Sequence, residues 1–156
     1  MSKREFSKVS PAVWRSGRFT GLECSTAKVL YLYFLTCEHQ NSAGCFRLPD
    51  GYACSDLGWS PETYRSARDK LIAAELITVD LVTAEIYVDR WLKHNPPTNE
   101  KHSMGTRRII EAIESDLIRE KVEAEFLAAD ETRIAKVSPL HTSALANSRL
   151  VRGRAA

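Results

Sequence analysis

The stretch DGYACSDLGWSPETYRSARDKLIAA, residues 50–74, decides the fold. Gly58 is placed to end a short helix that begins at residue 50, because glycine takes the left-handed conformation after a helix at no steric cost. Ser60, followed by a proline, is a typical start for the next helix, with a capping hydroxyl and proline at the first helical position. The stretch therefore predicts two helices joined by a tight turn, the second over residues 61–74, which is the pattern of a helix-turn-helix.

The flanking sequence supplies the remaining elements of a small α+β domain. Residues 25–37 repeat apolar side chains at intervals of three and four, which predicts a buried helix, and residues 45–48 predict a very short strand. Residues 76–82 and 84–92 are rich in β-branched and aromatic side chains and predict a hairpin. The order predicts a mainly helical winged helix-turn-helix, in which a two-stranded wing closes the core and leaves the second helix of the turn exposed.

The C-terminal third predicts one long additional helix and a tail. With a winged-helix domain over residues 1–95, the proline-containing segment 96–102 is expected to be a linker, and residues 103–131 form an amphipathic helix. This helix has two interpretations: it packs back on its own domain, or it pairs with a second copy or another protein. The apolar side chains expected in such a contact are Ile110, Ile113, Leu117 and Leu127. Residues 132–156 are basic and expected to be mobile.

Charge is unevenly distributed along the chain. The 156 residues include 22 Lys and Arg and 20 Asp and Glu, a formal net charge of +2, and this length suits one domain with a short appendage. Residues 1–36 carry six basic and two acidic residues, or +4, whereas residues 109–132 carry two basic and eight acidic residues, or −6. Residues 133–156 carry five basic residues and no acid. Basic terminal segments of this kind are typical of proteins that meet nucleic acid.

Several short segments carry a resemblance to a known family. They are AKVL at 27–30, LTC at 35–37, GCFRLP at 44–49, LGWS at 57–60, LIAAELI at 71–77 and WLKHNPP at 91–97. Through them, residues 19–95, about half of the chain, resemble the winged-helix domain of phage and plasmid replication initiators (replisome organisers) and related small regulators.

The resemblance implies that helix 61–74 enters the major groove of double-stranded DNA while the hairpin touches the flanking backbone. The helix residues then expected to contact DNA are Thr63, Arg65, Ser66, Arg68 and Lys70. The N-terminal arm is expected to add electrostatic attraction through Lys3, Arg4, Lys8, Arg15 and Arg18. The hypothesis is a bacterial or phage DNA-binding protein that acts in transcription regulation or replication initiation, as a possible homodimer.

A second hypothesis comes from the weak charge of the elements that should touch DNA. Helix 61–74 has three basic and two acidic side chains, a net +1, and the hairpin tip has Asp80, Thr83 and Glu85 where phosphate binding favours Lys or Arg. The alternative is a winged-helix module that binds a host or phage protein as an adaptor or inhibitor.

The remaining motifs argue against other classes of protein. No GxxxxGK[ST] or GxGxxG loop and no recognisable nucleophile motif is present, so neither an enzyme nor a cofactor is expected. Cys37, His39, Cys45 and Cys54 do not have the paired spacing of a zinc site, and free thiols are expected. The longest apolar run, residues 29–35, is far short of the ~20 residues that a membrane span requires. With no export signal, a cytoplasmic location is expected.

Overall fold

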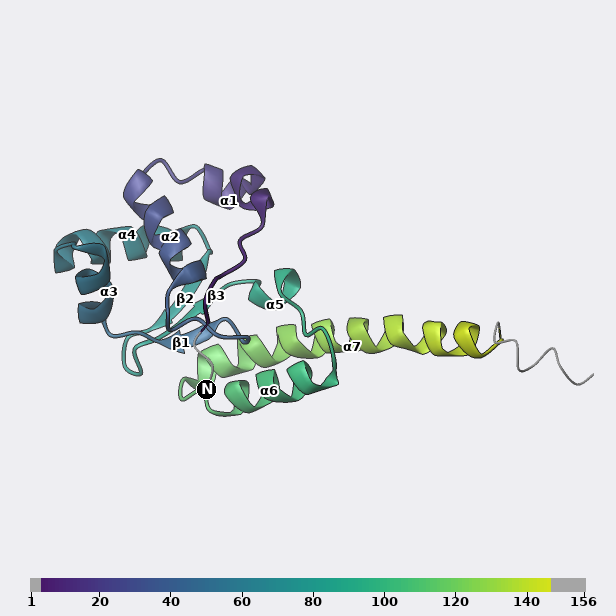
Figure 1. Ribbon diagram of the computed structural model, residues 1–156. Helices are drawn as coiled ribbons and strands as arrows, with labels where there is room; N and C mark the ends of the chain where they lie inside the picture. Colours follow the sequence, from purple (N-terminus) through teal and green to yellow (C-terminus); the bar gives the residue numbers. More distant parts are fainter. Residues whose placement is uncertain (1–3, 147–156) are drawn as a thin grey trace, which may run out of the picture.

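The computed structural model describes residues 4–146, with side chains described for residues 4–137, and is mainly helical with one small antiparallel sheet (Figure 1). Its elements in chain order are the 3₁₀ helix η1 (Pro11–Arg15), α1 (Gly17–Thr20), α2 (Ser25–Thr36), β1 (Cys45–Arg47), α3 (Asp50–Leu57), α4 (Pro61–Ala73), β2 (Ile77–Asp80), β3 (Glu85–Val88), α5 (Trp91–His94), α6 (Glu100–Glu111) and α7 (Asp116–Ala146).

The two helices predicted from residues 50–74 are present as α3 and α4. Gly58 ends α3 in the left-handed conformation, with a φ of 65°, and its amide donates to the carbonyl oxygen of Cys54. The hydroxyl oxygen of Ser60 accepts a hydrogen bond from the amide of Thr63, 3.2 Å away, at the start of α4. The local signals that end one helix and begin the next therefore act as the sequence predicts.

The sheet has three strands rather than the two of the predicted hairpin. Its order is β1-β3-β2, with Phe46 and Val79 both opposite Ile86 of the central strand. The hairpin turn is held by Asp80, whose Oδ1 accepts from the amides of Val82 and Thr83 at 2.9 and 3.3 Å. The short strand at residues 45–47 therefore pairs with the hairpin and ties it to the helical core.

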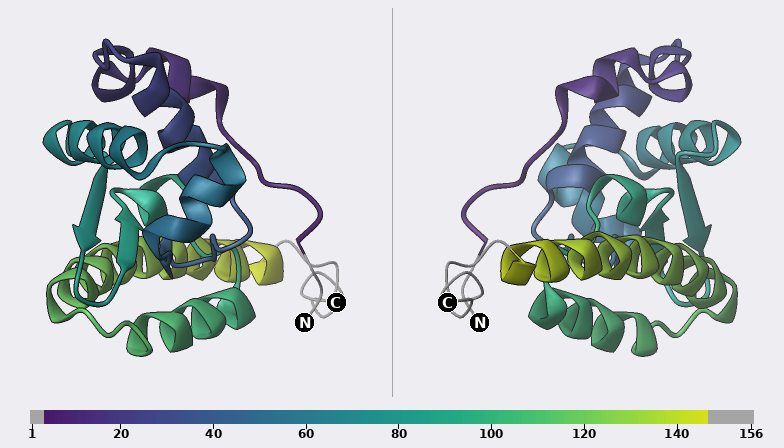
Figure 2. Two further views of the ribbon diagram at one scale, coloured as in Figure 1. Left: turned by 90° about the vertical axis from the view of Figure 1, so that its left-hand side faces the viewer. Right: turned by 90° about the vertical axis from the view of Figure 1, so that its right-hand side faces the viewer.

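The two faces of the sheet pack against different helices. On one face, Phe46 lies 6.2 Å from the Phe34 ring of α2, within the buried core shared by α2, α3 and α4. On the other face, the Tyr87 hydroxyl donates to Glu125 of α7. Figure 2 shows α6 and α7 lying together along one end of the molecule, away from α1 and α2. The C-terminal helices therefore belong to the same packed body as the sheet.

The predicted single C-terminal helix is wrong, because residues 112–115 interrupt it. The amides of Glu114 and Ser115 leave the helical pattern and donate to the Glu85 carboxylate at 3.0 and 2.8 Å. The linker is also shorter than residues 96–102, since α6 begins at Glu100. Helix α7 continues to Ala146, beyond the predicted end at residue 131, and residues 147–156 of the predicted mobile tail lie outside the described residues.

Within residues 4–146, none of the helices combines the length and the apolar character needed to cross a bilayer.

Candidate nucleic-acid interface

Helix α4 presents a polar face to solvent. Tyr64, Ala67 and Leu71 bury its other side in the core. The exposed side chains on this helix that were predicted to contact DNA are Thr63, Arg65, Ser66 and Lys70. Glu62 and Asp69 are exposed on the same helix, so the two cations and two anions of the exposed surface cancel. This face offers hydroxyl and guanidinium donors without a net positive charge.

Arg68, also predicted to contact DNA, is buried and bonded within the protein. Its side chain is 8% exposed, and Nη1 donates to Oδ1 of Asp50 over 2.9 Å. The guanidinium also lies 5.6 Å from the ring centroid of Tyr64, a cation–π arrangement. Positions 64, 67, 68 and 71 share one side of a helix with 3.6 residues per turn. Arg68 therefore lies on the inward side of α4, whereas Ile72 is 41% exposed.

Asp50 links α3 to α4 through both arginines. In addition to Arg68, it accepts from Nε of Arg65 at 3.4 Å. The Arg65 side chain is 58% exposed, and such exposed pairs contribute little stability, so Arg65 is free to exchange Asp50 for a phosphate or a base. Burial, reinforced by the Asp50 carboxylate, raises the pKa of Tyr64 to about 12. The cluster holds α3 and α4 at a fixed angle.

Two arginines of the N-terminal arm hold the fold together. Arg4 donates to the carbonyl oxygens of Cys37 at 2.6 Å and Gln40 at 3.2 Å, and so satisfies acceptors just beyond the C-terminal end of α2. Arg18 donates through Nη1 to the carbonyl oxygen of Glu75, just after α4. Arg4 is thus a capping residue, which a sequence count of positive charges does not distinguish from a DNA contact. Lys3 lies outside the described residues.

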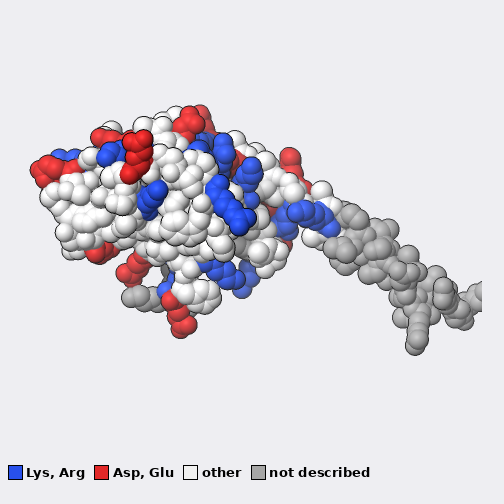
Figure 3. Space-filling model, turned by 90° about the horizontal axis from the view of Figure 1, so that it is seen from above, with Lys and Arg blue, Asp and Glu red and all other residues white. Residues whose placement is uncertain are grey.

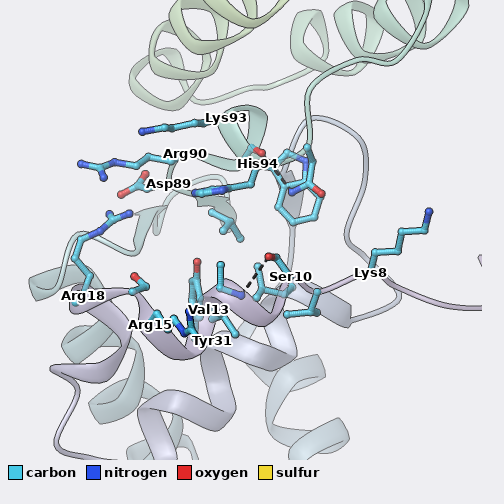
Figure 4. A pocket seen from close by; sticks show the side chains of 18 residues that line it. Lys8, Ser10, Val13, Arg15, Arg18, Tyr31, Asp89, Arg90, Lys93 and His94 are labelled. Carbon is cyan, nitrogen blue, oxygen red and sulfur yellow. Dashed lines mark hydrogen bonds between the residues drawn. The ribbon is translucent and has the colours of Figure 1, made fainter.

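A basic cavity of about 790 Å³ lies between the η1–α1 segment and α5 (Figure 4). Its lining brings together side chains from two distant parts of the sequence. The cations are Lys8, Arg15, Arg18, Arg90 and Lys93, with Asp89 as the acid. In the close view, Arg18 and Arg15 come from one side, and Arg90 and Lys93 from the other. Three of the predicted arm residues, Lys8, Arg15 and Arg18, line this cavity, with Lys8 on the side away from Arg15 and Arg18 (Figure 4).

The charge of Asp89 is already balanced outside the cavity. Its Oδ1 accepts from Nζ of Lys121 and from the hydroxyl of Thr78, both at 2.8 Å. By contrast, the side chains of Lys8, Arg15, Arg90 and Lys93 form no ion pair within residues 4–137. Within the described side chains, the positive charge of these four residues is therefore not paired with an acid.

The segment that precedes η1, which carries Lys8, lies away from α4. In the left view of Figure 2, α4 lies at one edge of the molecule and the extended segment that precedes η1 descends at the opposite edge. Seen from above, Lys and Arg side chains gather near the middle of the surface (Figure 3). Of the predicted arm residues, Arg18 lies near the C-terminal end of α4, where it bonds the Glu75 carbonyl, and the joint contact of helix and arm with DNA stays a prediction.

Arg90 and Lys93 are cavity residues that the sequence reasoning missed. Both follow the hairpin and flank the start of α5, where Arg90 has a φ of 63° and occupies the cap position. The local signal was a small cluster of basic residues just after a strand. Their closeness to residues 8–18 depends on tertiary packing, which local patterns do not reveal.

The predicted dimer stripe is divided between core and surface. Ile110 and Ile113 are 2% and 4% exposed and pack inside the protein, which contradicts their assignment to a partner contact. Leu117 and Leu127 are 67% and 53% exposed. Because the break at residues 112–115 changes the direction of the chain, the four residues do not share one helical seam.

The cysteines are free thiols with different environments. Burial raises the pKa of Cys45 to about 12. At the start of α2, the amide of Ala27 and then the hydroxyl of Thr26 stabilise the thiolate and lower the pKa of Cys24 to about 7. Among the described residues, no group of three or more His, Cys, Asp or Glu side chains is arranged to hold a metal ion.

No protein family model, no curated protein and no solved structure matches this chain.

Proposed function

We propose that this chain is a winged-helix DNA-binding protein of bacterial or phage type that regulates transcription or initiates replication. The observation that carries the proposal is the exposed polar face of α4, a capped helix fixed on the core by its opposite side. The element order α2, β1, α3, α4, β2, β3, with a hairpin after the second helix of the turn, supports the proposal. In this role the protein binds rather than catalyses.

The proposed contacts come from the exposed part of α4. The Arg65 guanidinium and the Lys70 ammonium can reach phosphates or the guanine edge. The hydroxyls of Thr63 and Ser66 can donate to phosphate oxygens. With only two cations on this face, binding by α4 alone should release few counterions. The slope of log K against log salt should then be about −2, and affinity should fall roughly tenfold between 50 and 200 mM salt.

The test is a fluorescence-anisotropy titration of a mixed-sequence duplex DNA library at these two salt concentrations. We expect the double variant Arg65→Glu/Lys70→Glu to lose at least tenfold in affinity, because it reverses both cations. The matched control is Lys101→Glu/Arg108→Glu, which reverses two exposed cations on α6 and should leave affinity within twofold. Absence of DNA binding at 50 mM salt by the intact chain would refute the proposal.

The hairpin tip favours a second candidate function, the binding of another protein. Leu81 and Val82 are 70% and 96% exposed there, next to Asp80 and Thr83. An exposed apolar tip is poorly suited to phosphates and well suited to an apolar groove on a partner. If the intact chain shows no DNA binding, Leu81→Ser/Val82→Ser becomes the variant to compare in partner capture, and loss of a specific partner would support this function.

A further inference from the structure

The basic cavity has a concentration of positive charge that favours the binding of an anion. Five cations line it, and the single lining carboxylate, Asp89, is paired with Lys121 behind the wall. Like charges gathered around a concave surface create a positive potential that a multiply charged anion would relieve. Because Arg18 uses one nitrogen to reach the Glu75 carbonyl, its other donors remain for a ligand.

Apolar side chains form the other part of the lining. They are Val13, Tyr31, Leu35, Val88 and Trp91. The indole N–H of Trp91 already donates to the carbonyl of Ser42 at 3.1 Å, so its ring is held in place in the wall. Gly44 packs so closely against that ring that an added Cβ would lie 2.2 Å from it. The wall is therefore rigid, apolar and partly aromatic, which suits a planar ring better than an inorganic ion.

Polar groups beside the apolar wall can orient such a ring. Asn95 uses its side-chain nitrogen to donate to the Trp91 carbonyl at 3.3 Å, which leaves its amide oxygen as an acceptor. His94 also lines the cavity. The volume of about 790 Å³ lies within the range of sites for small organic ligands.

We propose that the basic cavity binds a nucleotide, with its phosphates among Arg15, Arg18, Arg90 and Lys93 and its base against the apolar wall near Tyr31 and Trp91. The binding mode uses side-chain cations in place of a glycine-rich phosphate loop. This site does not include the exposed residues of α4, so the inference does not rest on the proposed DNA-binding function.

The first experiment is isothermal titration calorimetry of the intact chain with four probes in 50 mM salt: ADP, AMP, inorganic pyrophosphate and adenosine. We expect ADP to bind at least tenfold more tightly than either pyrophosphate or adenosine, because only ADP has both the charge and the ring. AMP should lie between adenosine and ADP. Equal affinity for ADP and pyrophosphate would overturn the assignment of the apolar wall to a base.

The second experiment removes one cation from each wall. Arg15→Gln/Lys93→Gln alters two exposed side chains that have no hydrogen bond or ion pair within residues 4–137, so the fold should be unaffected. We expect at least a tenfold loss of ADP affinity, with an unchanged thermal unfolding temperature. The matched control, Lys101→Gln/Arg108→Gln, removes the same charge from α6 and should change ADP affinity less than twofold.

A third comparison separates this inference from DNA binding. The Arg65→Glu/Lys70→Glu variant should retain full ADP affinity, whatever its effect on DNA. If ADP fails to bind at millimolar concentration while Arg15→Gln/Lys93→Gln weakens duplex binding tenfold, the cavity holds a DNA phosphate and the nucleotide proposal is overturned. Equal loss of ADP affinity in the cavity variant and in its α6 control would also overturn it.

Discussion

The exposed face of α4 and the basic cavity differ in how their positive charges are paired. On α4, Asp50 pairs with both Arg65 and Arg68, and the other exposed charges, Glu62, Asp69 and Lys70, sum to −1. In the basic cavity, Arg15 and Lys93 have no acidic partner within residues 4–137, and the one lining carboxylate is balanced from behind. Binding to α4 would therefore depend mainly on the positions of its hydrogen-bond donors, whereas binding in the cavity would depend mainly on electrostatic attraction to its cations.

The largest expected effect is on the α4 side, at Asp50. Asp50→Ala should lower the free energy of unfolding by about 3 kcal/mol, because it leaves the buried Arg68 guanidinium without its anion. Urea denaturation measures this change. Asp69→Ala is the control: Asp69 is 71% exposed and 3.9 Å from Nε of Arg68, and its loss should cost less than about 0.5 kcal/mol. Equal stability of both variants would show that Asp50 is not the anchor of Arg68.

A smaller effect is expected on the cavity side, at Lys121. Lys121→Met removes the cation that lies 2.8 Å from Asp89 and returns an unbalanced negative charge to the cavity wall. ADP affinity should fall roughly tenfold, or about 1.4 kcal/mol, while DNA affinity stays the same. Adding Asp89→Asn to Lys121→Met should restore most of the loss, as a double-mutant cycle by calorimetry would detect. A tenfold loss that Asp89→Asn does not reverse would mean that Lys121 acts by some route other than Asp89.

The smallest effect concerns Cys24, at the start of α2 and outside the lining of the cavity. Because the pKa of Cys24 is lowered to about 7, half of its thiol is ionised near neutral pH. Its alkylation rate with iodoacetamide should reach half of its maximum near pH 7, as read by mass spectrometry of the labelled peptide. Buried Cys45, with its pKa raised to about 12, should remain unlabelled over the same range. A midpoint above pH 8 would contradict the assigned environment of Cys24.

The local parts of the fold were predictable because their signals are local. Ser60 and Gly58 act through the backbone groups of their own helices, so the boundaries of α3 and α4 could be predicted from residues 50–74. The break between α6 and α7 also has a local signal in the sequence. Ser115 accepts from the amide of Ile118 at 3.4 Å and precedes an aspartate in the first turn of α7.

The candidate site was less predictable, because its character depends on long-range pairing. Arg65 and Arg68 are both plausible DNA contacts by residue type, and both pair with Asp50 of α3. Arg68 is the buried one because it lies on the inward side of α4. The basic cavity is even harder to predict from local sequence patterns. Arg15 and Lys93 are far apart in sequence, and the folded chain brings them to one cavity.

The hydrogen bonds from Arg4 to the carbonyl groups beyond α2 fix the N-terminal end of the extended segment that precedes η1. Lys8 lies in this segment, between Arg4 and η1, and lines the cavity. Proteolytic trimming that removes Arg4 would free the N-terminal end of this segment. The cavity wall that contains Lys8 would then loosen while the core stays folded. A preparation shortened in this way would show normal unfolding together with weakened ligand binding, so intact mass should be verified before any binding measurement.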